Sequence, residues 1–213
     1  ILVTGGAGSM GRLVVGNLLG QGHTVRVFDL PTVNYEGLEG EPSVEIARGD
    51  LTNSSDVGSA CEGVDAVAHL AAILPPVAEA NPDLTRHVNI DGTRVVVEAI
   101  QTNASSARLV LSSSVSVYGD TTPQGDEITV DRAANPDDVY AASKAESEAI
   151  VVESDLDWIG LRISGVAVPV FQEPPAEWPF TPDERIEFVH RDDAVSALSA
   201  ALTANGAGRS IYN

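Results

Sequence analysis

The sequence predicts an α/β fold in which helices cover both faces of a parallel β-sheet. Short apolar runs of strand length alternate with amphipathic stretches of helical period through residues 1–164. Hairpin signals are scarce between these runs, so consecutive strands are expected to be joined by helical crossovers. Together the two observations predict a doubly wound parallel sheet.

The first expected elements follow in strand–helix order. Residues 1–4 form a short apolar run that ends in glycines, and residues 11–21 carry apolar side chains at helical spacing. Residues 24–30 (TVRVFDL) and 44–47 are rich in β-branched and aromatic side chains, and are expected to be strands. The apolar run 66–72 (AVAHLAA) is expected to be a third buried segment of this kind.

The second group of elements repeats this order. Residues 89–101 hold Val96, Val97 and Ile100 at helical spacing, and residues 108–114 (RLVLSSS) form the next strand. A helix is expected at 139–153, a strand at 158–164 and a last helix at 192–203. Asp192 or Asp193 is expected to cap the start of that last helix, and Asn205-Gly206 to end it.

Composition excludes several classes of protein. The 213 residues are 43% hydrophobic, which excludes disorder, and no apolar stretch approaches the roughly eighteen residues of a membrane span. The lone Cys61 cannot form an internal disulfide and no signal peptide is visible, so a cytoplasmic location is predicted. The net charge of −19 repels nucleic acid and anionic lipid, so neither is an expected partner.

The charge has a second implication. Of the twelve basic residues, Lys144 is the one lysine and the others are arginine. Such acid-rich, lysine-poor composition resembles that of proteins from salt-accumulating organisms and predicts a halophilic protein with an acidic surface. Self-repulsion should then make it unfold at a lower temperature in low salt than in molar KCl. The alternative is an ordinary acidic protein, for which the two midpoints would agree.

A glycine-rich turn follows the first expected strand. Gly5, Gly8 and Gly11 have GxxGxxG spacing, which suits a tight turn, a close backbone approach to a pyrophosphate and close helix–strand packing. The amides of Ser9 and Met10 at the helix start would then face the anion. An ordinary glycine turn is the alternative. In its strand–helix context the loop predicts a Rossmann-type dinucleotide site.

Asp29 strengthens this prediction. It ends the second strand, where a carboxylate accepts hydrogen bonds from the adenosine ribose hydroxyls and repels a 2′-phosphate. The cofactor is therefore predicted to be NAD rather than NADP. Arg26 lies on the same strand but three residues earlier, too early to favour NADP. A solvated carboxylate at a strand end is the alternative.

Tyr140 and Lys144 stand four residues apart, on one face of the expected helix. A nearby ammonium and an oxidised nicotinamide would both favour the phenolate, so that Tyr140 could act as a base near neutral pH. Ser114, at a strand end, could hydrogen-bond the reacting oxygen of the substrate. The alternative is a packed tyrosine and a surface lysine. These three residues are the predicted catalytic group.

With these motifs the sequence resembles the extended short-chain dehydrogenase/reductase family, in its NAD-dependent epimerase/dehydratase branch. TGGAGSMG resembles the family's TGxxGxxG, and YAASK its YxxxK. GDL at 49–51, HLAA at 69–72, NIDGT at 89–93, SSSVSVYG at 112–119 and FVHRDD at 188–193 resemble further family motifs.

The resemblance implies roles for further residues. It implies that Tyr140 and Lys144 contact the cofactor in addition to their catalytic roles. It implies further cofactor contacts for Asp50, Leu51, Leu70, Ala71, Ala72 and Ser112. It also implies a homodimer, paired through the helices at 89–101 and 139–153. The chain is expected to form one compact unit, with an NAD-binding domain at 1–168 and a small, incomplete substrate-side region at 169–213.

Two departures bear on the substrate. Gly165 stands where the family often has an asparagine that touches a sugar nucleotide, and Ile186 stands where an arginine grips the diphosphate, although Arg185 is adjacent. Three functions stay open: an epimerase or dehydratase acting on a sugar or sugar nucleotide, a simple dehydrogenase or reductase of a small alcohol or carbonyl compound, and a non-catalytic NAD-binding protein.

Other candidates have plainer interpretations. His69 is expected to be a packed core histidine, and Trp158 and Cys61 to be buried. His87 and His190 lack partners at metal-ligand spacing, so no metal site is predicted. Trp178, in the proline-rich stretch 169–182, is the candidate for lining a substrate pocket.

Overall fold

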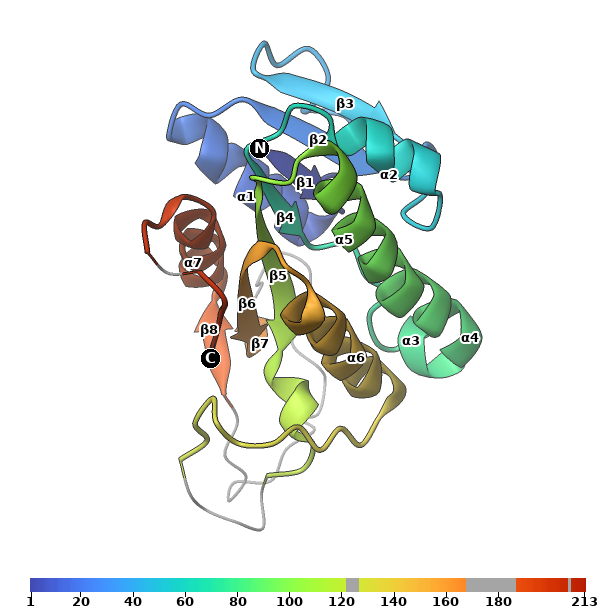
Figure 1. Cartoon of the computed structure of the whole chain (residues 1–213), viewed down its shortest axis with the longest axis vertical. Coiled ribbons are helices and arrows are strands. Elements are labelled where there is room, and N and C mark those ends of the chain that lie inside the picture. The colour runs from blue at the N-terminus through green and yellow to red at the C-terminus, as the bar shows by residue number, and fades with distance from the viewer. Residues whose placement is uncertain (122–126, 168–186, 207) are drawn as a thin grey trace, which may run out of the picture.

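The computed structural model describes residues 1–121, 127–167, 187–206 and 208–213. In these residues seven parallel strands form one sheet in the order β3-β2-β1-β4-β5-β6-β9 (Figure 1). The strands are β1 (Leu2–Thr4), β2 (Val25–Asp29), β3 (Val44–Arg48), β4 (Ala66–His69), β5 (Arg108–Ser114), β6 (Asp157–Ile163) and β9 (Ser210–Tyr212). A second, two-stranded parallel sheet pairs β7 (Gly165–Ala167) with β8 (Phe188–His190). The doubly wound parallel sheet predicted from the sequence is confirmed.

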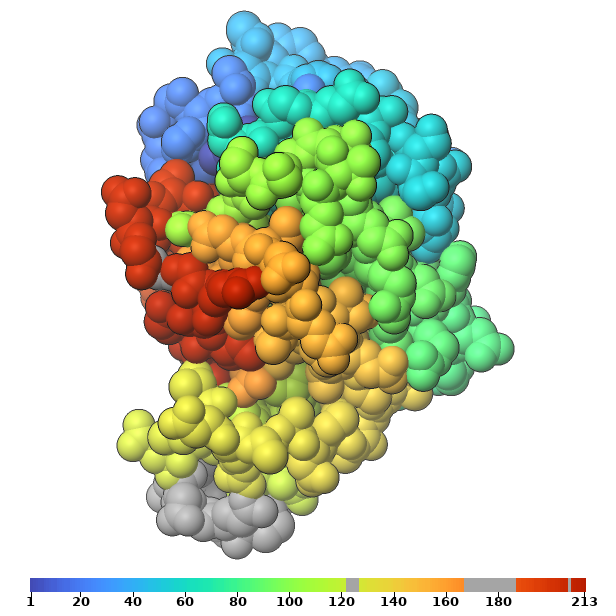
Figure 2. Space-filling model, viewed as in Figure 1, coloured from blue at the N-terminus to red at the C-terminus, as the bar shows by residue number. Residues whose placement is uncertain are grey.

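Helices cover both faces of the main sheet. On one face α1 (Ser9–Gly20) packs beside α7 (Arg191–Thr203). The other face carries α2 (Ser54–Cys61), α5 (Gly92–Asn103) and α6 (Val139–Glu153), which dominate the view in Figure 2 in cyan, green and orange. Between β4 and α5 lie the short helices α3 (Val77–Ala80) and α4 (Pro82–Thr85) and the π-helix η1 (Arg86–Asp91), and the 3₁₀ turn η2 (Val115–Tyr118) follows β5. None of the helices in the described ranges has the length and hydropathy of a membrane span.

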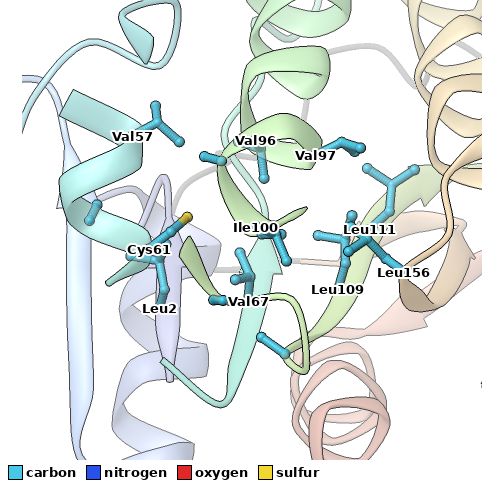
Figure 3. Close-up of a cluster of buried hydrophobic side chains, with 14 of the residues drawn as sticks. Leu2, Val57, Cys61, Val67, Val96, Val97, Ile100, Leu109, Leu111 and Leu156 are labelled. Carbon is cyan, nitrogen blue, oxygen red and sulfur yellow. The ribbon is translucent and has the colours of Figure 1, made fainter. Parts of the chain in front are cut away.

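Two apolar clusters hold these layers together, one on each side of the sheet. Figure 3 shows the cluster under α2 and α5, where Cys61, Val96 and Ile100 meet the strand residues Val67 and Leu109. All five side chains are buried, and each large aliphatic one contributes about 1.5–3 kcal/mol relative to an exposed position. The predicted burial of Cys61 and Trp158 is confirmed.

The strand order places the site. The chain runs outward from β1 through β2 to β3, then crosses back to β4 on the other side of β1. Ligands of doubly wound folds bind outside the carboxyl ends of the strands at such a reversal. Thr4, Asp29, His69 and Ser114 each end a strand at this edge.

Several boundaries differ from the sequence prediction. The helix expected at 89–101 begins earlier, as the π-helix η1, and continues as α5. Backbone hydrogen bonds of a π-helix join residues five apart, so its turn is wider than that of an α-helix. Helix α7 is capped by His190, whose Nδ1 accepts from the amide of Asp192, rather than by Asp192 or Asp193. Its end at Thr203 is the one predicted. Strand β9 was not predicted, because three residues carry no periodic signal. Trp178, Arg185 and Ile186 lie outside the described residues.

Candidate functional site

The glycine loop between β1 and α1 is too tight for side chains. Gly5 has a φ of +69°, and a Cβ there would lie 2.9 Å from both the Cα and the nitrogen of Ala71. A Cβ on Gly11 would overlap the carbonyl oxygen of Gly5 and come within 2.7 Å of the Cα of Gly6. The amide of Gly5 donates to the carbonyl of Phe28 at 2.9 Å, which ties the loop to β2. Helix and strand can therefore pack this closely only with glycine at these positions.

The loop leaves the start of α1 open to an anion. Gly8 is the N-cap, and it has no side chain to occupy the first-turn amides. The amides of Ser9, Met10 and Gly11 belong to that first turn, where no carbonyl of the same helix lies in reach. These donors and the positive end of the helix dipole fit the pyrophosphate of a dinucleotide.

Asp29 ends β2 beside this loop. Its Oδ2 accepts from the amide of Ala7 at 3.1 Å, and its Oδ1 from the amide of Leu30 at 2.9 Å. Arg26 points elsewhere, to the carbonyls of Ala60 at 2.8 Å and Glu62 at 2.7 Å. The carboxylate is thus fixed between the loop and the strand end, where an adenosine ribose would lie.

One cation near Asp29 was missed by sequence reasoning. Arg48 of β3 is the register partner of Asp29. Its guanidinium forms an ion pair with Glu39 and stacks 4.6 Å from the centre of the Tyr35 ring, whose hydroxyl donates to the carbonyl of Asp29 at 2.8 Å. Because Glu39 already neutralises this arginine, the strand end stays acidic around Asp29. Pairing between neighbouring strands, which the sequence did not specify, was the missing signal.

The GDL segment lies next along this edge. Asp50 accepts from the amide and hydroxyl of Thr52 at 2.9 and 2.8 Å, and these hydrogen bonds lower the pKa of its carboxyl group. Leu51 is buried, and its side chain packs against Gly92 at the start of α5. Asp50 therefore offers an ionised carboxylate at the rim of the site, whereas the side chain of Leu51 belongs to the core.

His69 joins the glycine loop to α5. Its Nδ1 lies 2.8 Å from the hydroxyl of Thr4, and its Nε2 lies 3.0 Å from that of Thr93. Complete burial lowers the pKa of His69 to about 3, so the ring is neutral at physiological pH. The predicted packed core histidine is confirmed. Leu70, Ala71 and Ala72 follow it, and the amide of Leu70 donates to the carbonyl of Thr4 at 3.2 Å.

Helix α6 and strand β5 bring the predicted catalytic group together. Lys144 is buried and donates from Nζ to the carbonyl of Ser112 at 2.8 Å, with Nζ 5.7 Å from the centre of the Tyr140 ring. Ser114 lies close enough to Tyr140 to lower the pKa of its phenol, and its Oγ accepts from the amide of Ser116 at 3.1 Å. Ser114, Tyr140 and Lys144 thus meet at the carboxyl end of β5.

Burial shifts the pKa values of two members of this group. Burial raises the pKa of Tyr140 to about 12, against the opposing effect of the Ser114 hydrogen bond. Burial also lowers the pKa of Lys144 to about 8, against the charge of Glu148. The phenolate predicted near neutral pH required both a nearby ammonium and an oxidised nicotinamide. Without the charge of the nicotinamide Tyr140 is a phenol at that pH, because desolvation raises its pKa and the ammonium of Lys144 donates to the carbonyl of Ser112.

The start of α6 is fixed by two carboxylates. Asp138 is the N-cap and accepts from the amide of Ala141 at 2.6 Å. Glu79 of α3 accepts from the amides of Val139 and Tyr140, both at 3.1 Å. Sequence reasoning missed Glu79, because it reaches α6 from a segment about sixty residues earlier. The backbone of Tyr140 is therefore held from outside its own helix.

Glu148 and Arg162 were also missed. The guanidinium of Arg162 on β6 donates from Nε and Nη2 to the two carboxylate oxygens of Glu148 at 2.9 and 2.7 Å, and each side chain is 7% exposed. Beside this pair a cavity of about 170 Å³ opens between β6 and α7, lined in part by Val115, Leu161, Glu187 and Asp193. Within the described ranges, three or more possible metal-ligating side chains do not gather at any point.

The chain resembles known proteins along its whole length. The model of the "NAD dependent epimerase/dehydratase family" matches residues 1–213. The chain is 34% identical over 178 residues to a 3-beta-hydroxysteroid dehydrogenase of Mycolicibacterium neoaurum, covering 78% of this chain and 47% of that protein. The chain spans about half the length of the curated relatives it matches.

Two solved structures resemble the whole chain. A UDP-glucose 4-epimerase of Thermus thermophilus in complex with NAD is 29% identical with a TM-score of 0.82, covering 100% of this chain and 76% of that one. A double mutant of DesIV, a dTDP-glucose 4,6-dehydratase of Streptomyces venezuelae with NAD and DAU bound, is 26% identical with a TM-score of 0.86, covering 99% and 74%. The described fold is thus shared with proteins that bind a dinucleotide.

Proposed function

Because the chain belongs to the NAD dependent epimerase/dehydratase family, we propose that it binds NAD and oxidises a hydroxyl group of a small-molecule substrate. The observation that carries this proposal is the meeting of Ser114, Tyr140 and Lys144 at the strand edge that also holds the glycine loop. A protein that only sensed NAD would have no need of this group.

The cofactor side supports NAD. The amides at the start of α1 suit the pyrophosphate, and the fixed carboxylate of Asp29 suits two free ribose hydroxyls rather than a 2′-phosphate. Asp50 would accept a hydrogen bond from the adenine amino group, the role that the family resemblance implies for it. Bound NAD supplies a hydride acceptor, and its nicotinamide carries a positive charge when oxidised.

The protein's own residues would handle the proton. Tyr140 Oη would accept the proton of the substrate hydroxyl, with Ser114 Oγ donating a hydrogen bond to the same oxygen. With its pKa near 12, Tyr140 needs a further positive charge beside it before it serves as a base, and Lys144 is the cation that the chain itself provides. Proton transfer should therefore be efficient only with the oxidised cofactor in place.

The substrate that the family favours is a sugar or a sugar nucleotide. An epimerase or dehydratase would return the hydride to the substrate after the keto stage. A simple dehydrogenase would release it with the cofactor, and the similarity to a 3-beta-hydroxysteroid dehydrogenase favours this second candidate, as does Gly165 in place of asparagine.

The variant Tyr140→Phe tests the proposal. It removes the phenolic oxygen and keeps the ring, so turnover should fall by about a thousandfold while the Kd for NAD stays within about twofold. The matched control is Tyr212→Phe, on an exposed tyrosine of β9, which should leave both values unchanged.

Turnover is followed with a panel of sugars, uronic acids, UDP-sugars and 3β-hydroxysteroids in molar KCl. Absorbance at 340 nm reports NADH, and proton NMR reports the substrate. Accumulating NADH would identify a dehydrogenase, and a new isomer without NADH an epimerase. Full turnover by Tyr140→Phe would contradict the mechanism.

A further inference from the structure

Resting on the function proposed above, we propose that Glu148 is a positioning residue for Lys144, and that its ion pair with Arg162 joins α6 to the turn that follows Ser114. Neither residue touches the reacting atoms. Their effect is to hold the ammonium and the serine turn in one rigid arrangement, so that the two sides of the catalytic group keep their relative position.

The contacts between α6 and β5 follow a regular pattern. Tyr140, Lys144 and Glu148 stand four residues apart, on one face of α6. Each meets one of three successive serines: Tyr140 meets Ser114, Lys144 the carbonyl of Ser112, and Glu148 the hydroxyl of Ser113 at 2.5 Å. Glu148 thus continues the catalytic face of α6 by one further turn, into the interior of the protein.

The ion pair is complete and buried. One carboxylate oxygen of Glu148 accepts from Ser113 and from Arg162 Nε, and the other from Arg162 Nη2. A buried pair of this kind contributes little net stability compared with well-packed hydrophobic residues, because desolvation offsets the Coulomb attraction. Stability by itself is therefore a weak reason for two charges at this position, and their neighbours suggest another.

The first of these neighbours is Lys144. Burial disfavours its ammonium form, and the carboxylate of Glu148 opposes that effect. The ionisable groups that face Lys144 are Tyr140 and Glu148 on α6 and His69 on β4, with Arg162 of β6 on the far side of Glu148. Because Tyr140 and His69 are neutral near pH 7, Glu148 is the anion that favours a charged lysine.

The second neighbour is the turn η2. Arg162 donates from Nη1 to the hydroxyl of Tyr118 at 2.6 Å, and its guanidinium lies 4.7 Å from the centre of that ring. Tyr118 ends η2, which begins directly after Ser114, and its hydroxyl donates to Asn213 Oδ1 at 2.7 Å. The same guanidinium donates to the carbonyl of Val130 at 3.2 Å. Arg162 therefore links the partner of Lys144 to the backbone that carries Ser114.

The variant Glu148→Gln tests the proposal, because it keeps the shape and removes the charge. Lys144 is the only lysine in the sequence, so lysine labelled with ¹³C at Cε gives one side-chain signal whose titration reports its pKa without any turnover. We expect that pKa to fall by about one pH unit or more from its value of about 8. In a plot of turnover against pH, the midpoint of the alkaline limb should move to lower pH by the same amount. The Kd for NAD should not change.

Glu146→Gln is the matched control. Glu146 lies two residues away on the same helix and pairs with Arg86 at the surface, so neither the titration nor turnover should change. If Glu148→Gln does not fold, the double variant Glu148→Leu/Arg162→Met replaces the pair with apolar side chains of similar volume. It should retain most of the stability and show a smaller fall in the pKa of Lys144, because the cation of Arg162 is lost together with the carboxylate.

The outcomes separate two failures. An unchanged pKa of Lys144 in Glu148→Gln or in the double variant would overturn the positioning role, whatever the turnover. Absence of turnover in the unmodified protein, together with a shifted pKa, would instead contradict the proposed function and leave the link between Glu148 and Lys144 in place. In Glu148→Asp the pKa of Lys144 should lie between its values in the unmodified protein and in Glu148→Gln, because aspartate keeps the charge but has a shorter side chain.

Discussion

The two sides of the candidate site use different chemical groups, backbone on one side and side chains on the other. The side formed by β1, β2 and α1 uses backbone: glycines that admit no Cβ, first-turn amides, and a carboxylate fixed by two further amides. The side formed by β5, α6 and β6 uses side chains, in which a buried lysine, glutamate and arginine share hydrogen bonds with serines and a tyrosine.

The difference suggests how each side tolerates change. Substitutions other than proline leave the backbone donors in place, so the cofactor side should fail when a side chain intrudes. Buried charges depend on their partners, so the catalytic side should fail when one partner is removed and the other is left unpaired. Substitutions on the two sides should therefore give losses of different kinds, which the following measurements compare.

The largest loss is expected from Arg162→Met. It leaves the carboxylate of Glu148 buried without its main partner, which should lower the free energy of unfolding by about 4 kcal/mol. The control is Arg86→Met, which breaks an exposed ion pair with Glu146 and should cost under about 1 kcal/mol. Urea unfolding in constant molar salt measures both. Equal losses would show that the buried pair does not behave as an ion pair.

Gly11→Ala should have the next largest effect, on the cofactor side. The new methyl group would overlap the carbonyl oxygen of Gly5, an atom of the backbone that cannot rotate away. Overpacking of this severity should lower the free energy of unfolding by about 3 kcal/mol and weaken NAD binding. The control is Gly16→Ala in the same helix, where the methyl group meets no described atom within 4 Å and should stabilise by about 0.5–1 kcal/mol. Calorimetry with and without NAD separates the loss of stability from the loss of NAD binding. Equal stability of Gly11→Ala and Gly16→Ala would contradict the close packing at Gly11.

Asp29→Ala should weaken NAD binding by about 2 kcal/mol, or roughly thirtyfold, because it removes charge-assisted hydrogen bonds to the ribose. The affinity for NADP should change less, so the preference between the two cofactors should narrow. Titration calorimetry with each dinucleotide measures this, with Glu45→Ala as the control, since Glu45 pairs with Arg26 away from the strand edge. An unchanged Kd for NAD would remove Asp29 from the cofactor site.

The smallest effect concerns His69, which lies between the two sides. Its pKa is about 3 in the folded chain and near 6.5 in the unfolded chain, so the unfolded state binds more protons between these values. Stability is full above pH 6.5 and falls as the pH drops, by about 1.4 kcal/mol per pH unit once the unfolded histidine is protonated. The free energy of unfolding of His69→Gln should therefore depend less on pH between 6.5 and 5, and parallel curves would show that His69 is protonated in the fold.

The two sides also differ in what the sequence revealed. The glycine spacing, Asp29 and the limits of α6 could be predicted, because a turn, a strand end and a helix are specified by neighbouring residues. The pair of Glu148 and Arg162 could not, because it depends on β6 lying next to β5 in the register that sets Arg162 opposite Ser113. The contact of Glu79 with the amide of Tyr140 depends in the same way on how α3 packs beside α6.

Local patterns were also insufficient for the chemistry of Tyr140. The four-residue spacing placed Tyr140 and Lys144 on one face, as α6 has them. The degree of burial and the turn of the ammonium toward the carbonyl of Ser112 follow from tertiary packing, and these set the pKa of the phenol. Spacing therefore predicted that the two side chains share one face of the helix, and packing set their pKa values.

The buried Cys61 is a natural probe for local opening of the fold. It is the single cysteine of the sequence, its side chain lies in the cluster beneath α2 and α5, and burial raises the pKa of its thiol to about 11. In the closed fold a thiol-reactive dye therefore meets neither an accessible sulfur nor a thiolate. Labelling of the native protein by such a dye should proceed at the opening rate of that layer when reclosing is slow, and in proportion to the open population when reclosing is fast. A spectrophotometer can therefore follow the opening of this layer without any engineered probe.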